Sequence, residues 1–168
     1  MNEIFPDGDG TLSLCRLDAS WARRAADFDA RIFRDEAWPF DVWQEMLSNP
    51  DLSFFAYVRP AEGMQTHGDI VALGGISNGD EPEILTLGVE QSHRGQGLGA
   101  QLLDFLIAQA QKNMNATHIT LEVRADNEEA LALYTSRGFT PCATPHVNRH
   151  RHQEKGIRKA QISLIKKL

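Results

Sequence analysis

A glycine-spaced loop past the middle of the chain constrains the fold more than any other feature. It runs Arg94-Gly95-Gln96-Gly97-Leu98-Gly99, follows the apolar run from Ile84 to Val89, and precedes a Leu-rich stretch with helical spacing. The start of a helix leaves backbone N–H groups without partners, and the helix dipole favours negative charge there. Glycine lets a backbone approach an anion closely because it has no Cβ. The segment predicts a strand, a phosphate-binding turn with Arg94 as a fixed positive charge, and a helix. The alternative is a turn that needs glycine for shape alone.

Two other kinds of phosphate site do not match this loop. A P-loop requires Lys followed by Ser or Thr directly after the glycines, and neither follows Gly99. A dinucleotide-binding site requires a parallel sheet that begins near the N-terminus, with an acidic residue about 20 residues beyond the loop. Here the loop follows a meander of predicted strands instead.

Periodicity elsewhere predicts the remaining elements. Alternating or continuous apolar runs predict strands, and apolar residues three or four positions apart predict helices. The predicted strands cover residues 12–17, 53–58, 70–77, 84–89, 117–124, 139–142 and 160–165, and the predicted helices cover 19–33, 40–47, 98–112 and 127–137. This order predicts an α/β fold, with one mixed sheet and helices on both of its faces.

The strand predicted over 117–124 alternates cleanly, with Ile119, Leu121 and Val123 facing one way and Thr120, Glu122 and Arg124 the other. Asp126 or Asn127 then caps the next helix, and Glu129 completes a capping-box pattern with Asp126. Gly138 ends that helix.

Composition limits the class of protein. The 168 residues suit one domain over 1–168, and 42% hydrophobic with 24% charged residues is ordinary for a globular protein. The net charge of −6 argues against nucleic-acid binding as the main role, although the last twenty residues are basic. That basic end either contacts an acidic partner or is a solvated surface. Two cysteines without metal-like spacing, and no signal or membrane segment, predict a cytoplasmic protein.

Two blocks together resemble the GNAT (Gcn5-related) N-acetyltransferases. The first is Leu87-Gly88-Val89 followed by Arg94, Gly97 and Gly99, and the second comprises Leu121-Glu122-Val123-Arg124, Asn127, Ala130, Leu133-Tyr134 and Gly138-Phe139. The second block looks most like the ribosomal-protein-alanine N-acetyltransferases, and the resemblance covers residues 84 to 140. Those enzymes usually carry a Tyr-Tyr pair before the last strand, where this chain has His146-Val147-Asn148-Arg149-His150-Arg151-His152.

The resemblance implies a GNAT fold with a mostly antiparallel sheet and acetyl-CoA as cosubstrate. It implies that Leu87, Gly88 and Val89 hold the acetyl carbonyl and the pantetheine arm. Residues Arg94, Gly95, Gln96, Gly97, Leu98, Gly99 and Ala100 would bind the pyrophosphate, and Asn127 would contact the pantetheine end. It also implies Glu122 as the base and Tyr134 as the acid that protonates the departing sulfur.

Each of the residues with a proposed chemical role also has a simpler structural interpretation. Glu122 could be solvated or an ion-pair partner of Arg124, Tyr134 could serve packing alone, and Asn127 could be only a helix cap. The chemistry fits the proposed roles, because an amine must lose a proton before it attacks a thioester and the leaving thiolate must gain one. A phenol is protonated at neutral pH, as an acid must be.

The histidines at 146, 150 and 152 fit no standard zinc spacing, so no metal site is predicted, and a role in acceptor binding is favoured for that segment. Among the tryptophans, Trp38 is the candidate for a substrate contact. The expected acceptor is a primary amine, such as a protein N-terminus. An acidic cleft formed by Glu36, Asp35 or Asp41 would instead favour small cationic amines, and a CoA-binding module without catalysis is a further alternative. We expect a monomer or homodimer.

Overall fold

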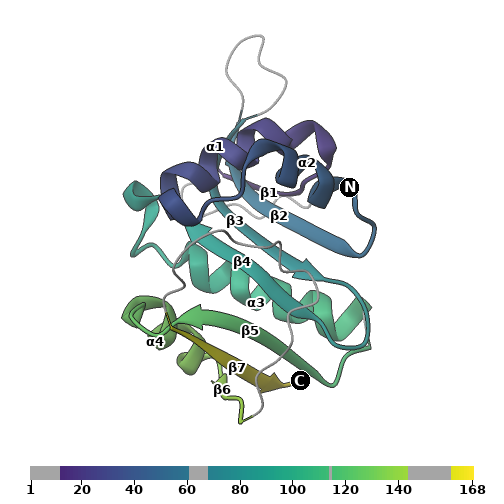
Figure 1. The fold of residues 1–168 in the computed structure, drawn as a ribbon, viewed down its shortest axis with the longest axis vertical. Coiled ribbons are helices and arrows are strands. Elements are labelled where there is room, and N and C mark those ends of the chain that lie inside the picture. The colour runs from purple at the N-terminus through teal and green to yellow at the C-terminus, as the bar shows by residue number, and fades with distance from the viewer. Residues whose placement is uncertain (1–11, 61–67, 114, 144–159) are drawn as a thin grey trace.

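The computed structural model describes residues 12–60, 68–113, 115–143 and 160–168. Its strands form one sheet in the order β1-β2-β3-β4-β5-β7-β6 (Figure 1). The strands are β1 (Ser13–Arg16), β2 (Leu52–Arg59), β3 (Asp69–Ser77), β4 (Glu83–Val89), β5 (His118–Arg124), β6 (Thr140–Pro141) and β7 (Gln161–Lys167). The helices are α1 (Ala22–Phe33), α2 (Phe40–Ser48), α3 (Leu98–Asn113) and α4 (Glu128–Ser136), with short 3-10 turns at Ala19–Trp21, Arg34–Glu36 and Gln91–His93.

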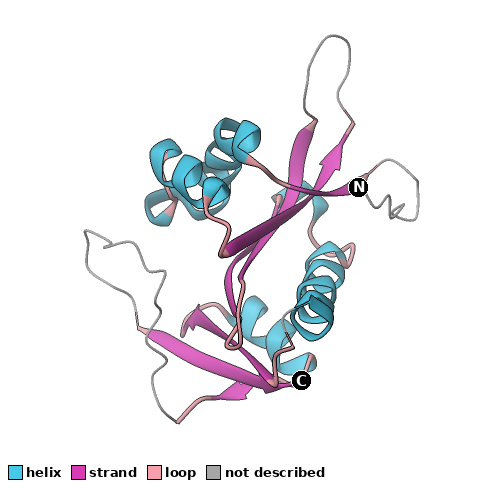
Figure 2. Cartoon of the chain, turned by 90° about the vertical axis from the view of Figure 1, so that its right-hand side faces the viewer, coloured by secondary structure: helices cyan, strands magenta, loops and turns pink. Residues whose placement is uncertain are grey.

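Helices cover both faces of the sheet. Figure 2 shows α1 and α2 on one side of the strands and α3 and α4 on the other. On the first side, Phe28 of α1 and Trp43 of α2 are fully buried against β2 and β3. On the second side, Leu103 and Leu106 of α3 pack on Ile119 and neighbouring strand residues. Because β3 is covered from both sides, every residue from Ile70 to Ser77 is buried, as expected for a central strand.

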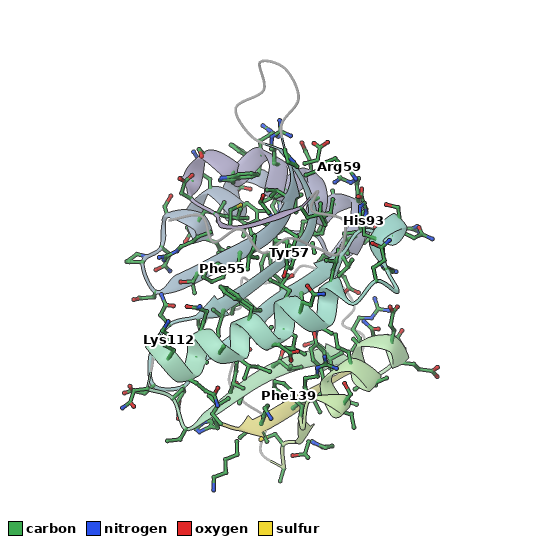
Figure 3. All side chains as sticks on the ribbon, turned by 180° about the vertical axis from the view of Figure 1, so that it is seen from behind. Phe55, Tyr57, Arg59, His93, Lys112 and Phe139 are labelled. Carbon is green, nitrogen blue, oxygen red and sulfur yellow. The ribbon has the colours of Figure 1, made fainter. Side chains whose placement is uncertain are left out.

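Figure 3 views the molecule from the α3 side and shows Phe55 and Tyr57 of β2 on one flank of that helix, with Phe139 on the other. Phe55 packs edge-on against Phe105 of α3, with ring centroids 4.9 Å apart. The Tyr57 hydroxyl lies 3.3 Å from the Gln101 side-chain oxygen. The packing of Phe55 on Phe105 holds α3 against β2. The beginning of α3 belongs to the site described below.

The sheet opens at its centre. All neighbouring strands pair antiparallel except β4 and β5, which pair in parallel only at Glu83 with Thr120 and at Ile84 with Leu121. Directly after this pairing, the register of β4 with β3 shifts, so that Leu85 has no partner opposite it. A bulge of this kind bends a strand. Residues beyond Ile84 and Leu121 therefore line a gap between diverging strands.

The structure confirms the predicted α/β architecture, including the mostly antiparallel sheet and the helices on both faces. Gly138, at φ 84°, ends α4 as expected. The capping-box prediction was wrong. Asn127 is the cap and its side chain accepts a hydrogen bond from the Ala130 N–H at 3.1 Å, whereas Asp126 is bound by Arg124. The segment of histidines and arginines at 146–152 lies outside the described residues.

Candidate active site

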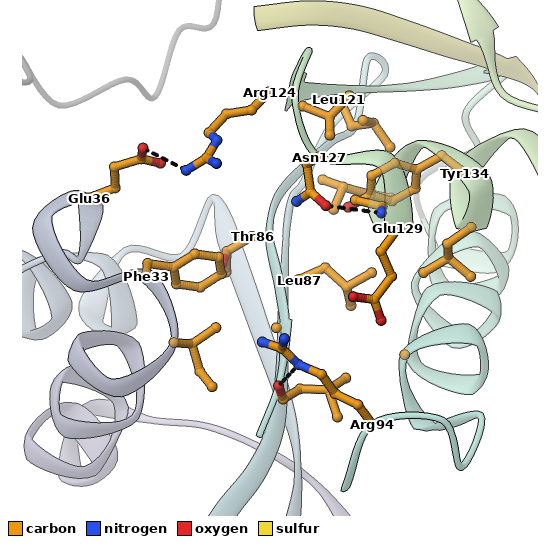
Figure 4. Close-up of a pocket in the computed structure, with 18 of the residues that line it drawn as sticks. Phe33, Glu36, Thr86, Leu87, Arg94, Leu121, Arg124, Asn127, Glu129 and Tyr134 are labelled. Atoms are coloured by element: carbon orange, nitrogen blue, oxygen red, sulfur yellow. Dashed lines mark hydrogen bonds and ion pairs between the residues drawn. The ribbon is translucent and has the colours of Figure 1, made fainter. Parts of the chain in front are cut away.

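A pocket of about 890 Å³ lies where β4 and β5 diverge. Its walls come from four places: the end of α1 with the turn after it, the outer half of β4, the loop into α3, and β5 with the start of α4. Figure 4 shows Phe33 and Glu36 on one wall, Thr86 and Leu87 of β4 between the walls, and Asn127 and Tyr134 on the other. All predicted site residues line this pocket except Gln96, whose side-chain amide turns back to the Ser92 carbonyl at 3.4 Å.

The glycine loop has the geometry predicted for an anion site. Gly95 and Gly97 have φ values of 75° and 83°, a region that favours glycine. The first helical bond of α3 runs from the Gln101 N–H to the Gly97 carbonyl at 3.0 Å. The N–H groups of Leu98, Gly99 and Ala100 therefore have no carbonyl within the helix to bind, and all three residues line the pocket.

Arg94 is anchored beside that helix start. Its Nε donates to the Val89 carbonyl at 3.1 Å, which leaves the side chain at the mouth of the pocket (Figure 4). A guanidinium and a helix N-terminus thus face the same space, and both attract negative charge. The loop can therefore hold a phosphate-bearing ligand.

The outer half of β4 supplies a backbone wall. Leu87, Gly88 and Val89 pair with β3 on one side and face the gap on the other. A Cβ placed on Gly88 would lie 3.2 Å from both Ile32 and Phe33, which is tighter than ordinary contact. Glycine at this position therefore lets the end of α1 press closely against the strand.

Glu122 and Tyr134 reach the pocket from different elements, Glu122 from β5 and Tyr134 from α4. Glu122 is half-buried on the face of β5 opposite to Leu121 and Val123, which are buried in one cluster with Tyr134 and residues of α3. Tyr134 is buried on α4, with its ring 5.8 Å from that of Phe139. Burial raises the pKa of the Tyr134 hydroxyl to about 12. The arrangement provides a carboxylate on one side of a bound ligand and a protonated phenol on the other.

Most of one wall of the pocket was not predicted from the sequence. It consists of Asp29, Ile32, Phe33 and Arg34, from the end of α1 and the turn that follows. Trp38, the tryptophan considered for a substrate contact, lines the same pocket. A signal was present in the sequence, because Asp29 falls on the apolar side of α1, four residues after Ala25 and three before Ile32. Of the three acids considered for an acceptor cleft, only Glu36 lines the pocket.

Arg124 connects this wall to β5. Its Nη1 donates to Glu36 at 3.0 Å, and its Nε donates to Asp126 at 2.8 Å. The ion pairs of Arg124 are thus made with Glu36 and Asp126, not with Glu122. The Glu36 pair joins two residues 88 positions apart and crosses the pocket from one wall to the other (Figure 4).

The acetyltransferase (GNAT) family model matches residues 19–139. The chain belongs to the GNAT acetyltransferase family. It is 35% identical to the N-alpha-acetyltransferase RimI of Mycobacterium tuberculosis over 133 residues, which cover 76% of this chain and 75% of that protein. It is 45% identical to the ribosomal protein bS18-alanine N-acetyltransferase of Escherichia coli over 60 residues, 36% of this chain and 40% of that enzyme.

The crystal structure of the ribosomal-protein-S18-alanine N-acetyltransferase from Escherichia coli has the same fold as this GNAT domain. It superposes with a TM-score of 0.71 and 24% identity over 92% of each chain. The predicted family and the predicted acyl-CoA-dependent N-acetyltransferase activity are confirmed by these matches. None of the described helices is long and apolar enough to span a membrane. Within the described ranges, no three His, Cys, Asp or Glu side chains gather closely enough to hold a metal ion.

Proposed function

We propose that this enzyme transfers the acetyl group of acetyl-CoA to the N-terminal amine of a peptide or protein. The observation that carries the proposal is the pocket between β4 and β5, which joins a helix-N-terminal anion site to a carboxylate on β5 and a phenol on α4. The relatives named N-alpha-acetyltransferase RimI and ribosomal protein bS18-alanine N-acetyltransferase support this choice of acceptor.

The residues present fit acetyl-CoA. A Cβ on Gly95 would meet nothing within 4 Å and one on Gly97 only the tip of Gln101 at 3.9 Å, so there is open space beside both glycines. Arg94 and the free N–H groups of Leu98, Gly99 and Ala100 would hold the pyrophosphate, with Gly95 and Gly97 shaping the loop. Leu87, Gly88 and Val89 would hold the pantetheine arm through their backbone, and Asn127 would contact the pantetheine end. Gln96, which points away, is not part of this set.

When bound, acetyl-CoA supplies an acetyl group activated as a thioester. Glu122 faces the side of β5 that is open to α1, where the acceptor would enter. A carboxylate there accepts a proton from the acceptor ammonium, directly or through water, and leaves the nitrogen lone pair available for attack. Its partially buried position limits competition from bulk water.

Tyr134 would complete the proton balance. Its hydroxyl keeps its proton at neutral pH because burial disfavours the phenolate. From the α4 side of the pocket it would donate that proton to the departing sulfur, so that the thiol leaves neutral. Base and acid then act on opposite sides of one reacting centre.

Two alternative functions make different predictions. We call the wall formed by the end of α1 and the turn up to Trp38 the acceptor wall. An acetyltransferase for small cationic amines would require free acidic side chains on this wall, but the Glu36 carboxylate is bound to Arg124. A CoA-binding module without catalysis would bind the cofactor and turn over no acceptor. The arrangement of Glu122 and Tyr134 favours catalysis.

The test is acetyl-CoA turnover, followed by thiol release, with alanine-initiated peptides and small amines as acceptors. We expect peptide-dependent turnover that falls at least about tenfold in Glu122→Gln and in Tyr134→Phe. Tyr57→Phe is the matched control, because it removes the hydroxyl of the other tyrosine in the chain, and we expect its kcat within about twofold of the wild type. Turnover with small amines alone would overturn the peptide assignment, and full activity in both site variants would overturn their roles.

Several expectations from the sequence stay predictions. They are a single domain over residues 1–168, a cytoplasmic location, and a monomer or homodimer. The continuous sheet from β1 to β7 supports the first of them.

A further inference from the structure

Arg124 occupies a specific place relative to the proposed base. It lies two residues after Glu122 on β5, so both side chains leave the same face of the strand. Both line the pocket, and β5 has no pairing with β4 beyond Leu121. The backbone of β5 at both residues is therefore not paired with β4.

The guanidinium of Arg124 is held at two of its three nitrogens. Nη1 is bound by Glu36 and Nε by Asp126, at 3.0 and 2.8 Å. Within the described part of the chain, Nη2 has no hydrogen-bond partner. Because the guanidinium is planar and rigid, two fixed nitrogens also fix the direction of the third. Arg124 thus presents an oriented, charged donor at the wall of the pocket.

The spacing of the two residues matches a peptide. Alternate residues of a strand lie about 6.6 Å apart, because each residue rises about 3.3 Å. In an extended N-terminal segment each residue also advances about 3.3–3.6 Å, so the carbonyls of the first two residues lie within roughly this distance of the amine. An amine at Glu122 therefore brings a carbonyl of the first or second acceptor residue to Arg124. A simple alkylamine has no group that reaches this position.

We propose that Arg124 is a specificity-determining residue that donates a hydrogen bond from Nη2 to a backbone carbonyl of the acceptor peptide, and that Glu36 positions its guanidinium. The proposal rests on the proposed peptide acetyltransferase function and deepens it. It explains how one site recognises peptides independently of their side chains, because every peptide carries that carbonyl.

The wall that carries Glu36 is itself fixed. Arg34 has a φ of 52°, a conformation that costs an ordinary residue free energy, and it begins the turn between α1 and α2. Asp29 accepts a hydrogen bond from the Trp38 N–H at 2.6 Å, and the Trp38 ring packs on Trp43 at 5.4 Å. The Ala37 N–H also donates to the Arg34 carbonyl at 3.1 Å, so hydrogen bonds hold the backbone of the turn from which Glu36 reaches Arg124.

Two acceptors test the carbonyl contact: Ala-Ala-Ala amide, and isopropylamine, which is alanine with the carbonyl replaced by a methyl group. In Arg124→Ala we expect the KM for the peptide to rise about tenfold, because a charge-assisted hydrogen bond is lost. We expect kcat, the KM for acetyl-CoA, and kcat/KM for isopropylamine within about twofold of the wild type. In Glu36→Gln the peptide KM should rise about threefold, and the double variant should match Arg124→Ala alone.

Arg137→Ala is the matched control. Arg137 pairs with Asp104 at 3.2 Å, and its side chain is 32% exposed, against 33% for Arg124. Neither Arg137 nor Asp104 lines the pocket. An equal rise in peptide KM in this control, or an equal loss for both acceptors in Arg124→Ala, would assign Arg124 a structural role and overturn the proposal. An unchanged peptide KM in Arg124→Ala would overturn it as well.

Calorimetric titration of Ala-Ala-Ala amide into the enzyme with bound CoA separates this proposal from the proposed function. Wild-type binding that weakens about tenfold in Arg124→Ala supports the contact even if no acetyl transfer occurs, and in that case only the proposed function fails. Absence of peptide binding in the wild type overturns the contact itself.

Discussion

The carboxylate of Asp29, on the buried side of α1, accepts a hydrogen bond from the backbone N–H of Trp38 at 2.6 Å. Asp29 is only 2% exposed. Burial raises its pKa to about 6, and the bond from Trp38 opposes that rise. The anchor of the acceptor wall is therefore a titratable group whose ionisation costs free energy in the folded state.

Replacing Asp29 with Asn removes this ionisation and keeps an oxygen that can accept from Trp38. A folded-state pKa above the unfolded value means that the contribution of Asp29 to stability is full below about pH 4 and is lost as the pH rises through about 6. The stability of Asp29→Asn relative to wild type should therefore increase between about pH 4 and pH 7.5, by up to about 3 kcal/mol.

Urea unfolding at the two pH values measures this difference. Asp27→Asn is the matched control, because it makes the same change of side chain at an exposed position of the same helix. A constant difference for Asp29→Asn would show that Asp29 titrates like an exposed carboxylate.

The buried phenol of Tyr134 leads to a prediction about pH. Because its pKa is about 12, Tyr134 should stay protonated throughout the range of an ordinary assay. Tyr134→Phe should lower kcat by at least about tenfold, and by the same factor from about pH 7 to pH 10. Profiles of log kcat against pH for wild type and variant should run parallel. A wild-type profile that falls and meets that of the variant near pH 9 would mean that the phenol ionises within the range.

Local patterns in the sequence predicted most of the fold, because strands and helices show their own periodicity and the glycine loop shows its own backbone requirement. The exception on the local scale was the capping box of α4, although Asn127 was one of the two predicted caps. Asp126 and Glu129 have the spacing of a capping box, but the Arg124 guanidinium binds Asp126, and Asn127 caps the helix instead. A side-chain interaction thus outweighed a spacing rule.

The acceptor wall could not be predicted in the same way. The pair between Glu36 and Arg124 depends on how α1 crosses β4 and on how far β4 and β5 diverge, and neither follows from local pattern. No local pattern in the sequence predicts the register shift at Leu85 either. The acid within the apolar stripe of α1, Asp29, was the one local sign that this helix borders a functional cavity.

Gly97→Ala should weaken use of acetyl-CoA. Alanine is strained at a φ of 83°, so relief of the strain would turn the first N–H groups of α3 away from the pocket. We expect the KM for acetyl-CoA to rise about tenfold or more, while the acceptor KM changes little. Gly79→Ala is the control, because Gly79 also has a positive φ, 117°, has open space around it, and lies in the turn between β3 and β4 away from the pocket. Equal rises in the two variants would mean that general destabilisation explains the result.

Asn127 combines a cap with a proposed cofactor contact, and two substitutions separate these roles. Asn127→Ala removes the acceptor of the Ala130 N–H, so it should lower the free energy of unfolding by about 1 kcal/mol. Asn127→Ser keeps a capping oxygen and should be nearly as stable as the wild type. Because serine is shorter and lacks the amide, both variants should raise the KM for acetyl-CoA, by about threefold or more. Thermal unfolding and initial-rate kinetics on the same preparations give both quantities. A Ser variant with wild-type stability and wild-type KM would leave Asn127 as a helix cap alone, since the pocket would then not use its amide.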